Sequence, residues 1–316
     1  MALFGLGRVG RAFLELLQER KTQVALVAAV DSRGALTGEL DPETVLNNKR
    51  QGLPPAGTEG TSATAESRPD VVVDLTSCDF ATGEPARSII QDGVDAGAHV
   101  VTANKAPLAR HWDDLHASVR ASGVALRYAA ACGAALPVIA VASSLRRSDH
   151  ICSVEGVLTG TAAYVLNEMR AGVAFEDAVR CAQQQGIAEP DPSIDMQGWD
   201  SAAKLVILAN TLWPAHLSLS SVSVTGVAAA REHPSDSVTH LISTATFDGS
   251  QVTAEVRPEK LPGGHPLSTL AGSDKGVVFT GPSIGRVVLT GGRSHPRGAA
   301  AAAFGDMLEA IEERKR

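Results

Sequence analysis

The segment at residues 186–204 concentrates ionisable groups where a loop runs into a helix. Its acidic residues are Glu189, Asp191, Asp195 and Asp200. Pro190 and Pro192 restrict the backbone around them, so we expect an extended, stiff loop. From Gly198 onward an apolar stripe predicts a helix, which carries Lys204 four residues after the last acid and on the same face. An acid beside a base at the end of a stiff loop suits proton transfer to a small polar molecule.

The simplest alternative is that Asp200 and Lys204 form a solvated ion pair of the kind common on long helices, worth only about tenths of a kcal/mol. The acidic loop argues against this interpretation, because clustered carboxylates repel one another unless a cation or hydrogen-bond donors complete them. The ammonium group of an amino acid would do so. We therefore interpret residues 186–204 as a substrate-binding segment.

Length and composition favour two domains and exclude several classes of protein. At 316 residues the chain is long enough for two apolar cores. Its 28 basic and 35 acidic residues form no basic stripe, so we expect no nucleic-acid partner. No apolar run reaches the roughly 20 residues of a membrane helix, and the first residues lack a signal-peptide pattern. These features predict a cytoplasmic protein with no membrane partner.

The cysteines give no sign of a metal site. They lie at positions 78, 132, 152 and 181, without a CxxC pair or metal-ligand spacing to histidine. We expect four small buried thiols in a reducing compartment and no bound metal.

A glycine-rich turn follows the first apolar run. We expect a strand at Ala2–Phe4, a helix at Arg8–Glu19 and a second strand at Val24–Val30 with an acid directly after it. A strand, a GxGxxG turn, a helix and an acid about 20 residues further on make up the dinucleotide-binding fingerprint. The residues predicted to bind a dinucleotide are Gly5, Leu6, Gly7, Arg8, Val9, Gly10 and Asp31.

Strands alternate with helices as far as about Tyr128, which predicts a parallel, doubly wound sheet. Further strands are expected at Val71–Leu75, Ala98–Thr102 and Val124–Tyr128, and helices near Pro42–Asn48 and at Glu84–Ala96 and Pro107–Ser122. In such sheets ligands bind beyond the carboxyl ends of the strands. Two of these ends carry polar residues, of which we assign Thr76, Ser77, Thr102, Asn104 and Lys105 to the cofactor site.

After Tyr128 the pattern changes and predicts a second, α+β domain. Its strands are expected at Ile151–Leu158, Val252–Val256, Gly276–Thr280 and Gly285–Leu289. The predicted α/β fold therefore has a Rossmann-type dinucleotide-binding domain at residues 1–128 and a substrate-binding and dimerisation domain at 129–296. A terminal helix at about 297–316 is expected to pack back on the first domain.

Taken in order, these motifs resemble those of the homoserine dehydrogenase family. The matching segments are Val-Val-Thr-Ala-Asn-Lys105 after a strand, Gly160-Thr161 followed by Tyr164, and Ala188-Glu189-Pro-Asp191-Pro with Asp195, Gly198, Asp200 and Lys204. They span nearly the whole chain, and the last of them is highly specific. The resemblance is to short, stand-alone members that have neither a kinase nor a regulatory domain.

The resemblance implies NAD(P)-dependent interconversion of L-homoserine and L-aspartate 4-semialdehyde by a homodimer, in the biosynthesis of threonine and methionine. Thr161, Tyr164 and Glu189 match residues that hold the amino-acid end of the substrate, and Asp195, Asp200 and Lys204 match residues around the reacting oxygen and the carboxylate. Lys105 matches a lysine proposed to move protons. We expect Lys105 to transfer the proton and Lys204 to polarise the substrate, with the reverse assignment left open.

Several positions depart from the family's pattern. Ala129 stands where relatives place a glutamate near a monovalent cation, which supports the expectation of no metal site. Thr159 replaces an asparagine or serine and keeps a hydroxyl. In place of a Gly-Ala-Gly turn beside the cofactor, the chain has Arg293 and His295 after two glycines. These two residues belong either to a surface loop or to a contact with cofactor phosphate or substrate.

Two questions stay open at this level. Asp31 suits the ribose hydroxyl of NAD, whereas Ser32 and Arg33 suit the 2′-phosphate of NADP, so either cofactor fits. The chain could also be a paralogue that acts on another hydroxy or oxo amino acid in a specialised pathway, or an NAD(P)-binding sensor without catalysis. The chain has the polar residues that match the family's site: Lys105, Glu189, Asp195, Asp200 and Lys204. A sensor without catalysis does not need them, which argues against that alternative.

Overall fold

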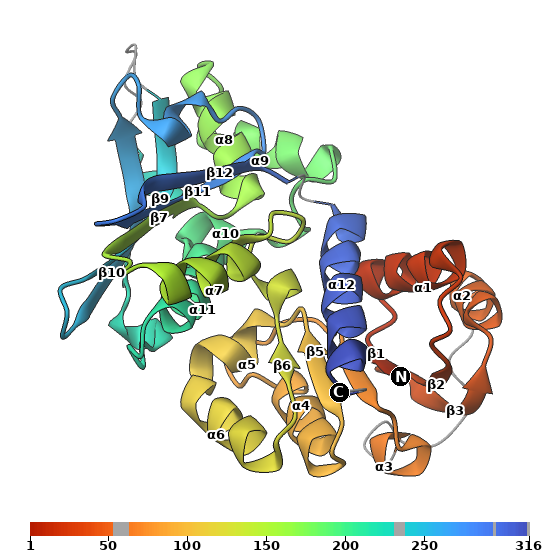
Figure 1. The fold of residues 1–316 in the computed structure, drawn as a ribbon. Coiled ribbons are helices and arrows are strands. Elements are labelled where there is room, and N and C mark those ends of the chain that lie inside the picture. The colour runs from red at the N-terminus through yellow and green to blue at the C-terminus, as the bar shows by residue number, and fades with distance from the viewer. Residues whose placement is uncertain (53–62, 231–237, 293–294, 315–316) are drawn as a thin grey trace. The chain divides into compact units, whose positions relative to one another are not determined.

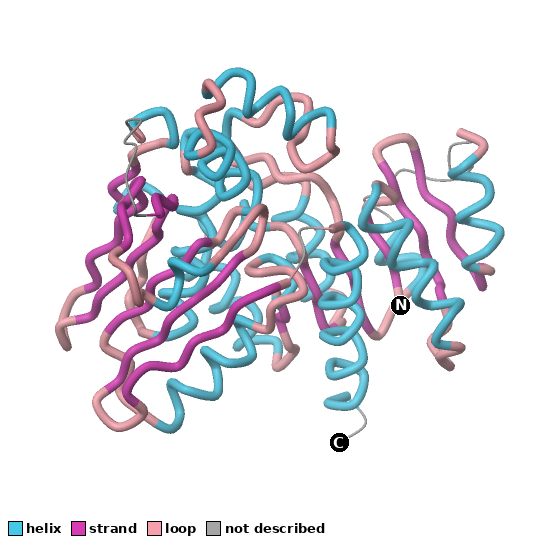
Figure 2. Tube along the Cα trace, turned by 90° about the horizontal axis from the view of Figure 1, so that it is seen from above, coloured by secondary structure: helices cyan, strands magenta, loops and turns pink. Residues whose placement is uncertain are grey.

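The computed structural model describes residues 1–52, 63–230, 238–292 and 295–314. The chain divides into two compact units, which we call unit 1 (Met1–Ala134 with His295–Arg316) and unit 2 (Ala135–Ser294). Each unit is built on one six-stranded sheet with helices packed against it (Figures 1 and 2).

The sheet of unit 1 has the strand order of a doubly wound dinucleotide-binding fold. Its strands are β1 (Ala2–Phe4), β2 (Leu26–Asp31), β3 (Gly34–Leu40), β4 (Val71–Asp74), β5 (His99–Thr102) and β6 (Leu126–Arg127). They are arranged β3-β2-β1-β4-β5-β6, and all neighbouring pairs except β2 with β3 are parallel. The predicted α/β class and its parallel sheet are confirmed.

The edge strand β3 is not among the strands expected from the sequence. It pairs antiparallel with β2, with Asp31 opposite Gly34, so that Ser32 and Arg33 form a two-residue hairpin turn. Most of β3 is exposed or half-buried, and an edge strand with little buried surface has no clear hydrophobic alternation. The hairpin places Ser32 and Arg33 at the carboxyl end of β2.

Helices cover both faces of this sheet. They are α1 (Arg8–Arg20), α2 (Pro42–Arg50), α3 (Ala63–Ser67), α4 (Ala86–Asp95), α5 (Lys105–Arg110), α6 (Trp112–Ser122), the 3-10 helix η1 (Ala129–Ala131) and α12 (Pro296–Arg314). Gly93 of α4 faces Val72 and Val100. The neighbouring residues along those strands, Val73 and Val101, point to the other face and join the core beneath α1 and α12.

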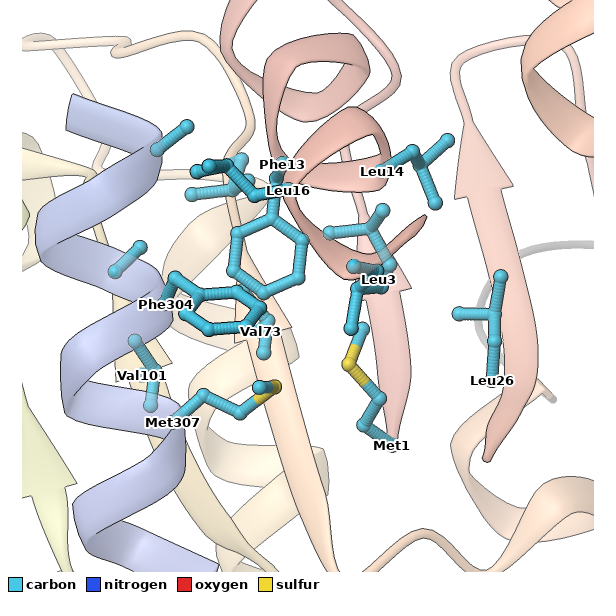
Figure 3. Packing of buried hydrophobic residues seen from close by; sticks show 14 of the residues in the cluster. Met1, Leu3, Phe13, Leu14, Leu16, Leu26, Val73, Val101, Phe304 and Met307 are labelled. Carbon is cyan, nitrogen blue, oxygen red and sulfur yellow. The ribbon is translucent and has the colours of Figure 1, made fainter. Parts of the chain in front are cut away.

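The first and last helices of the described chain lie side by side, although they come from opposite ends of the sequence (Figure 1). Phe13 of α1 meets Phe304 of α12 with ring centroids 5.7 Å apart, and Met307 packs into the same core (Figure 3). Tilted aromatic pairs at this distance add to the burial of apolar surface. The C-terminal helix therefore closes the core of unit 1.

The expected helix at Pro107–Ser122 is interrupted at His111 and forms α5 and α6 instead. The side chain of Arg110 donates to the carbonyl of Phe80 at 3.1 Å, and the ring of His111 lies 3.1 Å from the carbonyl of Thr82. These tertiary contacts turn the chain at a point where the local sequence alone favours a continuous helix.

Unit 2 is an α+β unit with a mixed sheet. Its strands are β7 (Ser153–Val157), β8 (Ser223–Val224), β9 (Val238–Phe247), β10 (Val252–Leu261), β11 (Lys275–Gly281) and β12 (Gly285–Gly291), in the order β12-β11-β7-β9-β10-β8. Its helices are α7 (Val138–Ser148), α8 (Gly160–Arg170), α9 (Phe175–Gln184), α10 (Ser193–Gln197) and α11 (Trp199–Leu212), with 3-10 turns η2 (Leu219–Ser221), η3 (Val227–Ala229) and η4 (Pro266–Thr269). Every pair is antiparallel except β8 with β10.

The structure also bears on the expectations about the cysteines, metal ligands and membrane-spanning helices. All four cysteines are reduced, but only Cys132 is buried and Cys152 is exposed, so the expectation of four buried thiols was wrong. Within the described ranges, no three His, Cys, Asp or Glu side chains gather as metal ligands. The helices described in the structure include none that combines the length and the hydropathy needed to cross a bilayer.

Asp306 connects α12 to the end of the sheet in unit 1. Its Oδ2 accepts a hydrogen bond from the backbone N–H of Ala129 at 2.7 Å, where η1 begins. Burial raises the pKa of Asp306 to about 6, although the Ala129 N–H and the nearby Arg127 oppose the shift. In the unfolded chain an Asp carboxyl has a pKa of about 3.9. Between about pH 3.9 and pH 6, Asp306 therefore binds more protons in the folded state than in the unfolded state. The free energy of unfolding contributed by this group is therefore highest at low pH and falls as the pH rises towards 6.

We predict that Asp306→Asn raises the free energy of unfolding at pH 7.5 by roughly 1–3 kcal/mol, since the amide oxygen still accepts from Ala129 but carries no buried charge. The gain should vanish near pH 4, where the wild-type group is protonated. Urea unfolding at both pH values measures this difference. Glu309→Gln is the matched control, because Glu309 lies on the same helix and contacts Arg127 but is exposed. A destabilised Asp306→Asn protein at pH 7.5 would contradict the prediction.

Candidate functional site

The glycine turn between β1 and α1 has the geometry of a ligand cradle. Gly5 has φ of +93°, and a Cβ there would lie 2.4 Å from the carbonyl oxygen of Leu75. A Cβ on Gly10 would lie 1.9 Å from the carbonyl oxygen of Gly5. By contrast, no described atom lies within 4 Å of a Cβ placed on the exposed Gly7. The turn is therefore tightly packed on the protein side and open at its centre, which is what a bound pyrophosphate requires.

The other residues of the turn contribute in different ways. The side chain of Leu6 is buried in the core of unit 1, so this residue presents only its backbone to a ligand. Arg8 is exposed and Val9 half-buried in the first turn of α1. The cradle at Gly5–Gly10 thus fits a dinucleotide mainly through backbone groups.

Asp31 lies among cations at the end of β2. Its carboxylate pairs with Lys49 of α2 and lies 3.8 Å from the guanidinium of Arg33, and it accepts the Arg33 backbone N–H at 2.7 Å. Burial works against the ionised form, yet Lys49 and the Arg33 N–H hold the pKa of Asp31 below its ordinary value. The Arg33 side chain also donates to the carbonyl of Gly52 at 3.2 Å. One carboxylate and two cations therefore meet where the fingerprint places the ribose of the cofactor.

The polar residues after β4 and β5 differ in their exposure. Ser77 is exposed and Thr76 and Lys105 are half-buried, but Thr102 and Asn104 are 0% exposed. The side chains of Thr102 and Asn104 are therefore buried, and their assignment to the cofactor site stays a prediction. They hold the loops: the Thr102 hydroxyl accepts the Asn104 N–H at 2.9 Å, and the Asn104 amide donates to the Ser77 carbonyl at 3.0 Å.

In unit 2, the predicted acid–base pair sits on a buried helix. All residues of α11 from Asp200 to Leu212 are buried except Lys204, whose side chain is 15% exposed. The Lys204 ammonium lies 2.5 Å from Asp200 Oδ2 and donates to the Leu158 carbonyl at 2.9 Å. The interpretation as a solvated surface pair is excluded by this burial. An ion pair in such a place needs further hydrogen bonds to offset its desolvation.

Thr159 and Ser201 supply these hydrogen bonds. The Thr159 hydroxyl donates to Asp200 Oδ2 at 2.8 Å and lies 2.8 Å from the Ser201 hydroxyl. Because the single Thr159 proton is directed to Asp200, Ser201 must be the donor to Thr159. A chain of donors therefore runs from Ser201 through Thr159 to Asp200, which also faces Lys204.

The start of α8 is tied to the segment that precedes the acidic loop. The Thr161 hydroxyl donates to the Ile187 carbonyl at 3.4 Å, and the Tyr164 hydroxyl receives the Gln185 amide at 2.7 Å. Desolvation raises the pKa of Tyr164, which is therefore a neutral hydroxyl at ordinary pH. These two contacts bring Thr161 and Tyr164 beside the chain that leads to Glu189.

The acidic loop is shorter than predicted. Glu189 is exposed in the non-helical stretch before α10, but Asp195 is half-buried within this helix, where the sequence suggested extended chain. Asp191 accepts the Ser193 N–H at 3.0 Å, close to the first turn of α10. The structure thus links Thr159 with Asp200 by a hydrogen bond and Asp200 with Lys204 by an ion pair. Glu189 lies in the non-helical stretch before α10, and Asp195 lies on α10.

The sequence left two roles open for Arg293 and His295, and the structure describes only His295. Arg293 lies outside the described residues. His295 is exposed, and its ring nitrogen Nδ1 accepts the Arg297 N–H at 3.2 Å at the start of α12. Its carbonyl also accepts the Gly298 N–H at 2.9 Å. His295 therefore caps a helix, which explains its presence without a ligand.

Sequence reasoning did not identify several residues that complete these arrangements: Lys49, Leu158, Gln185 and Ser201. Ser201 adjoins a predicted polar motif, and this proximity is a usable signal. Lys49 and Leu158 reach their partners from 18 and 46 residues away, and the second acts through its backbone. No local pattern marks such contacts.

Comparison with known families matches both units. The model described as "Homoserine dehydrogenase, NAD binding domain" matches residues 5–129, and the model "Homoserine dehydrogenase" matches residues 137–308. The first range contains the glycine cradle and the second contains α8 and α11.

Individual proteins are similar over nearly the whole chain. The NAD(+)-dependent homoserine dehydrogenase of Pseudomonas canavaninivorans is 33% identical, over 92% of this chain and 90% of its own. The homoserine dehydrogenase of Sulfurisphaera tokodaii is 30% identical, over 98% and 97%. The crystal structure of homoserine dehydrogenase from Thermoplasma acidophilum aligns with a TM-score of 0.88 and 26% identity, covering 98% of each chain. A hyperthermophilic archaeal homoserine dehydrogenase in complex with NADPH shares the fold, with a TM-score of 0.87, 23% identity and coverage of 99% and 97%.

The open space at Gly7 allows its role to be separated from that of Gly10. We predict that Gly7→Ala leaves the melting temperature nearly unchanged but weakens dinucleotide binding at least tenfold, because the added methyl group occupies the ligand side of the turn. Gly10→Ala should instead destabilise the fold by roughly 1–3 kcal/mol or more, since its Cβ collides with backbone. Thermal unfolding and titration with reduced dinucleotide measure the two effects. Unchanged affinity in Gly7→Ala would show that this turn does not carry the ligand.

Proposed function

The chain belongs to the homoserine dehydrogenase family, and on that premise we propose that it interconverts L-homoserine and L-aspartate 4-semialdehyde with NAD or NADP. Unit 1 binds the cofactor and unit 2 binds the amino acid. The reaction belongs to amino-acid biosynthesis leading to threonine and methionine. The observation that carries the proposal is the ion pair of Asp200 and Lys204 on the buried helix α11.

Lys204 is suited to polarising the reacting oxygen. Its ammonium is fixed by an ion pair with Asp200 and by a hydrogen bond to the Leu158 carbonyl. A fixed cation in a largely buried place stabilises negative charge that develops on a carbonyl or alkoxide oxygen. Proton removal from this lysine would leave Asp200 as an uncompensated buried charge. We therefore assign polarisation, rather than proton transfer, to Lys204.

The remaining groups have complementary roles. Thr161 and Tyr164 offer hydroxyls, and Glu189 a carboxylate, for the carboxylate and ammonium of the substrate. Asp195 and Asp200 lie around the reacting end. A bound nicotinamide would supply the hydride acceptor for oxidation of the alcohol and the hydride donor for reduction of the aldehyde. Lys105, held at the start of α5, takes the hydroxyl proton in oxidation and gives it back in reduction.

We predict that Lys204→Ala lowers the kcat of homoserine oxidation by roughly 10²–10³-fold, because it removes the donor aimed at the developing oxyanion. Cofactor affinity should change little, since Lys204 belongs to unit 2. Formation of reduced nicotinamide, followed by absorbance, measures turnover. Asp177→Asn is the matched control: it disrupts a helical ion pair with Arg180 that is exposed on both sides. Normal turnover in Lys204→Ala would refute the assignment.

The same assay separates the competing functions. Activity with another hydroxy amino acid but not with L-homoserine would identify a paralogue of a different pathway. Cofactor binding without turnover on any amino alcohol would identify a sensor. Reduction of NAD or NADP by L-homoserine in the wild-type protein supports the proposed function against both.

We also propose that the cluster of Asp31, Lys49 and Arg33 distinguishes NADP from NAD. The carboxylate suits the 2′-hydroxyl of NAD, and the two cations suit the 2′-phosphate of NADP. Both cofactors can therefore be accepted, and the balance depends on whether Lys49 remains paired with Asp31.

We predict that Lys49→Ala weakens NADP binding about tenfold or more, the loss expected for a charge-assisted hydrogen bond, while NAD binding changes much less. Asp31→Asn should have the opposite effect and favour NADP, because it leaves both cations without the competing carboxylate. Titration of each variant with both reduced cofactors measures the ratio. Arg50→Ala is the control, since Arg50 is the next residue on α2 and pairs with Glu15 at the surface. An unchanged ratio in Lys49→Ala would refute the role of Lys49.

We propose finally that the protein works as a cytoplasmic homodimer formed through the sheet of unit 2. Strand β12 lies at the edge of this sheet and exposes Val288, an apolar side chain that is 43% accessible. Light scattering of the purified protein tests the stoichiometry.

A further inference from the structure

Four polar side chains are assembled at the carboxyl ends of β4 and β5 in unit 1: Asp74, Thr76, Thr102 and Asn104. Asp74, Thr102 and Asn104 are 0% exposed. A carboxyl group so deeply buried is expensive unless donors surround it. The direction of each hydrogen bond in this group follows from which partner can donate.

The backbone fixes the orientation of Asn104. The N–H of Ala106 can only donate, and it reaches Asn104 Oδ1 at 3.1 Å. The other end of the amide is then the NH₂ group, which donates to the Ser77 carbonyl at 3.0 Å and to the Thr76 hydroxyl at 3.2 Å. Asn104 therefore joins the loop after β4 to the first turn of α5.

The same argument fixes both threonine hydroxyls. The backbone N–H of Asn104 donates to the Thr102 hydroxyl at 2.9 Å, so the Thr102 proton is left for Asp74 Oδ2 at 2.7 Å. The Thr76 hydroxyl accepts from the Asn104 amide, so its proton is directed to Asp74 Oδ1 at 2.6 Å. The backbone N–H of Thr76 also donates to Oδ1 at 3.0 Å.

All these hydrogen bonds converge on Asp74 as the final acceptor. Three donors meet its two oxygens, and a proton on the carboxyl would face groups that are already donating to it. Burial raises the pKa of Asp74, and the hydrogen bonds from Thr76 and Thr102 oppose that shift. The ionised carboxylate is thus the form that satisfies every member of the network.

We propose that Asp74 is a positioning residue for the dehydrogenase reaction, whose carboxylate orders the Thr76–Ser77 loop and the start of α5 and so fixes the place of Lys105. Lys105 directly follows Asn104 and is the first residue of α5. This inference rests on the proposed function, in which Lys105 transfers the proton. It also explains why Thr102 and Asn104 are polar although neither reaches the surface.

Asp74→Asn tests the proposal without creating a cavity, because the two side chains have nearly the same shape. The amide supplies one acceptor oxygen and one NH₂ group, so at least one threonine donor meets another donor. We expect kcat to fall at least tenfold, as for a reacting group displaced by a fraction of an ångström to 1 Å, while the KM for homoserine and the Kd of reduced cofactor change less than about threefold.

Hydrogen exchange gives a readout that does not depend on turnover. Peptides that cover residues 75–78 and 102–110 should exchange their amide protons faster in Asp74→Asn than in the wild-type protein. Asp79→Asn is the control, because Asp79 follows the same strand but makes its hydrogen bonds at the surface. This control should keep both the turnover and the exchange pattern of the wild type.

A second pair of variants keeps the test decisive if Asp74→Asn does not fold. Thr102→Val removes the hydroxyl at nearly constant volume and should reproduce the loss in kcat, whereas Thr102→Ser restores the hydroxyl and should recover most of that loss. Unchanged kcat and exchange in a folded Asp74→Asn or Thr102→Val protein would overturn the proposal. So would a loss that appears only in cofactor affinity. A wild-type protein without homoserine oxidation would instead refute the proposed function, and the exchange experiment would still decide whether Asp74 orders these loops.

Discussion

The burial of carboxylates is the constraint on which the architecture of both units depends. A carboxylate removed from water must receive hydrogen bonds or an opposing charge, because its desolvation otherwise costs several kcal/mol. In unit 1, Asp74 is met by donors from the chain after β4 and after β5. In unit 2, Asp200 is met by Thr159 and by Lys204. In each unit, the groups that satisfy the acid include the lysine proposed to react or a residue just before it, so stability and the proposed chemistry share contacts.

This coupling explains why the two lysines proposed to react lie on or directly beside rigid elements. Lys204 projects from a helix whose other residues from 200 to 212 are buried, and its ammonium is fixed by a carboxylate and a carbonyl. Lys105 begins a short helix whose preceding residue, Asn104, is anchored at both ends of its amide. The exposed acid Glu189, by contrast, lies in a short non-helical stretch between two helices. Glu189 is thus the more adaptable of the proposed site residues, whereas each lysine is pre-organised within its own unit.

Local pattern was enough to predict the parallel strands and the glycine turn, because a buried parallel sheet produces continuous apolar runs and a tight turn requires glycine. It failed where tertiary contacts decide the structure. Strand β3 has too little buried surface to show alternation, and the break at His111 depends on carbonyls about 30 residues away. The ion pair of Asp200 and Lys204 could be predicted from the sequence, because the two residues are four positions apart on one helix. The pairing of Asp31 with Lys49 could not be predicted, because the two residues are 18 positions apart and only the tertiary fold brings them together.

The position of α12 has a consequence for the order in which the protein is made. Residues 1–134 leave the ribosome without Phe304 and Met307, which fill the core beneath α1, whereas residues 135–294 form an uninterrupted segment with their own sheet. Unit 2 can therefore complete its fold during synthesis before unit 1 does, although residues 1–134 precede it in the sequence. The glycine cradle must wait, with part of its supporting core open to solvent, until the last helix arrives. Cofactor present during synthesis would bind only after that step, and would then stabilise unit 1 by mass action.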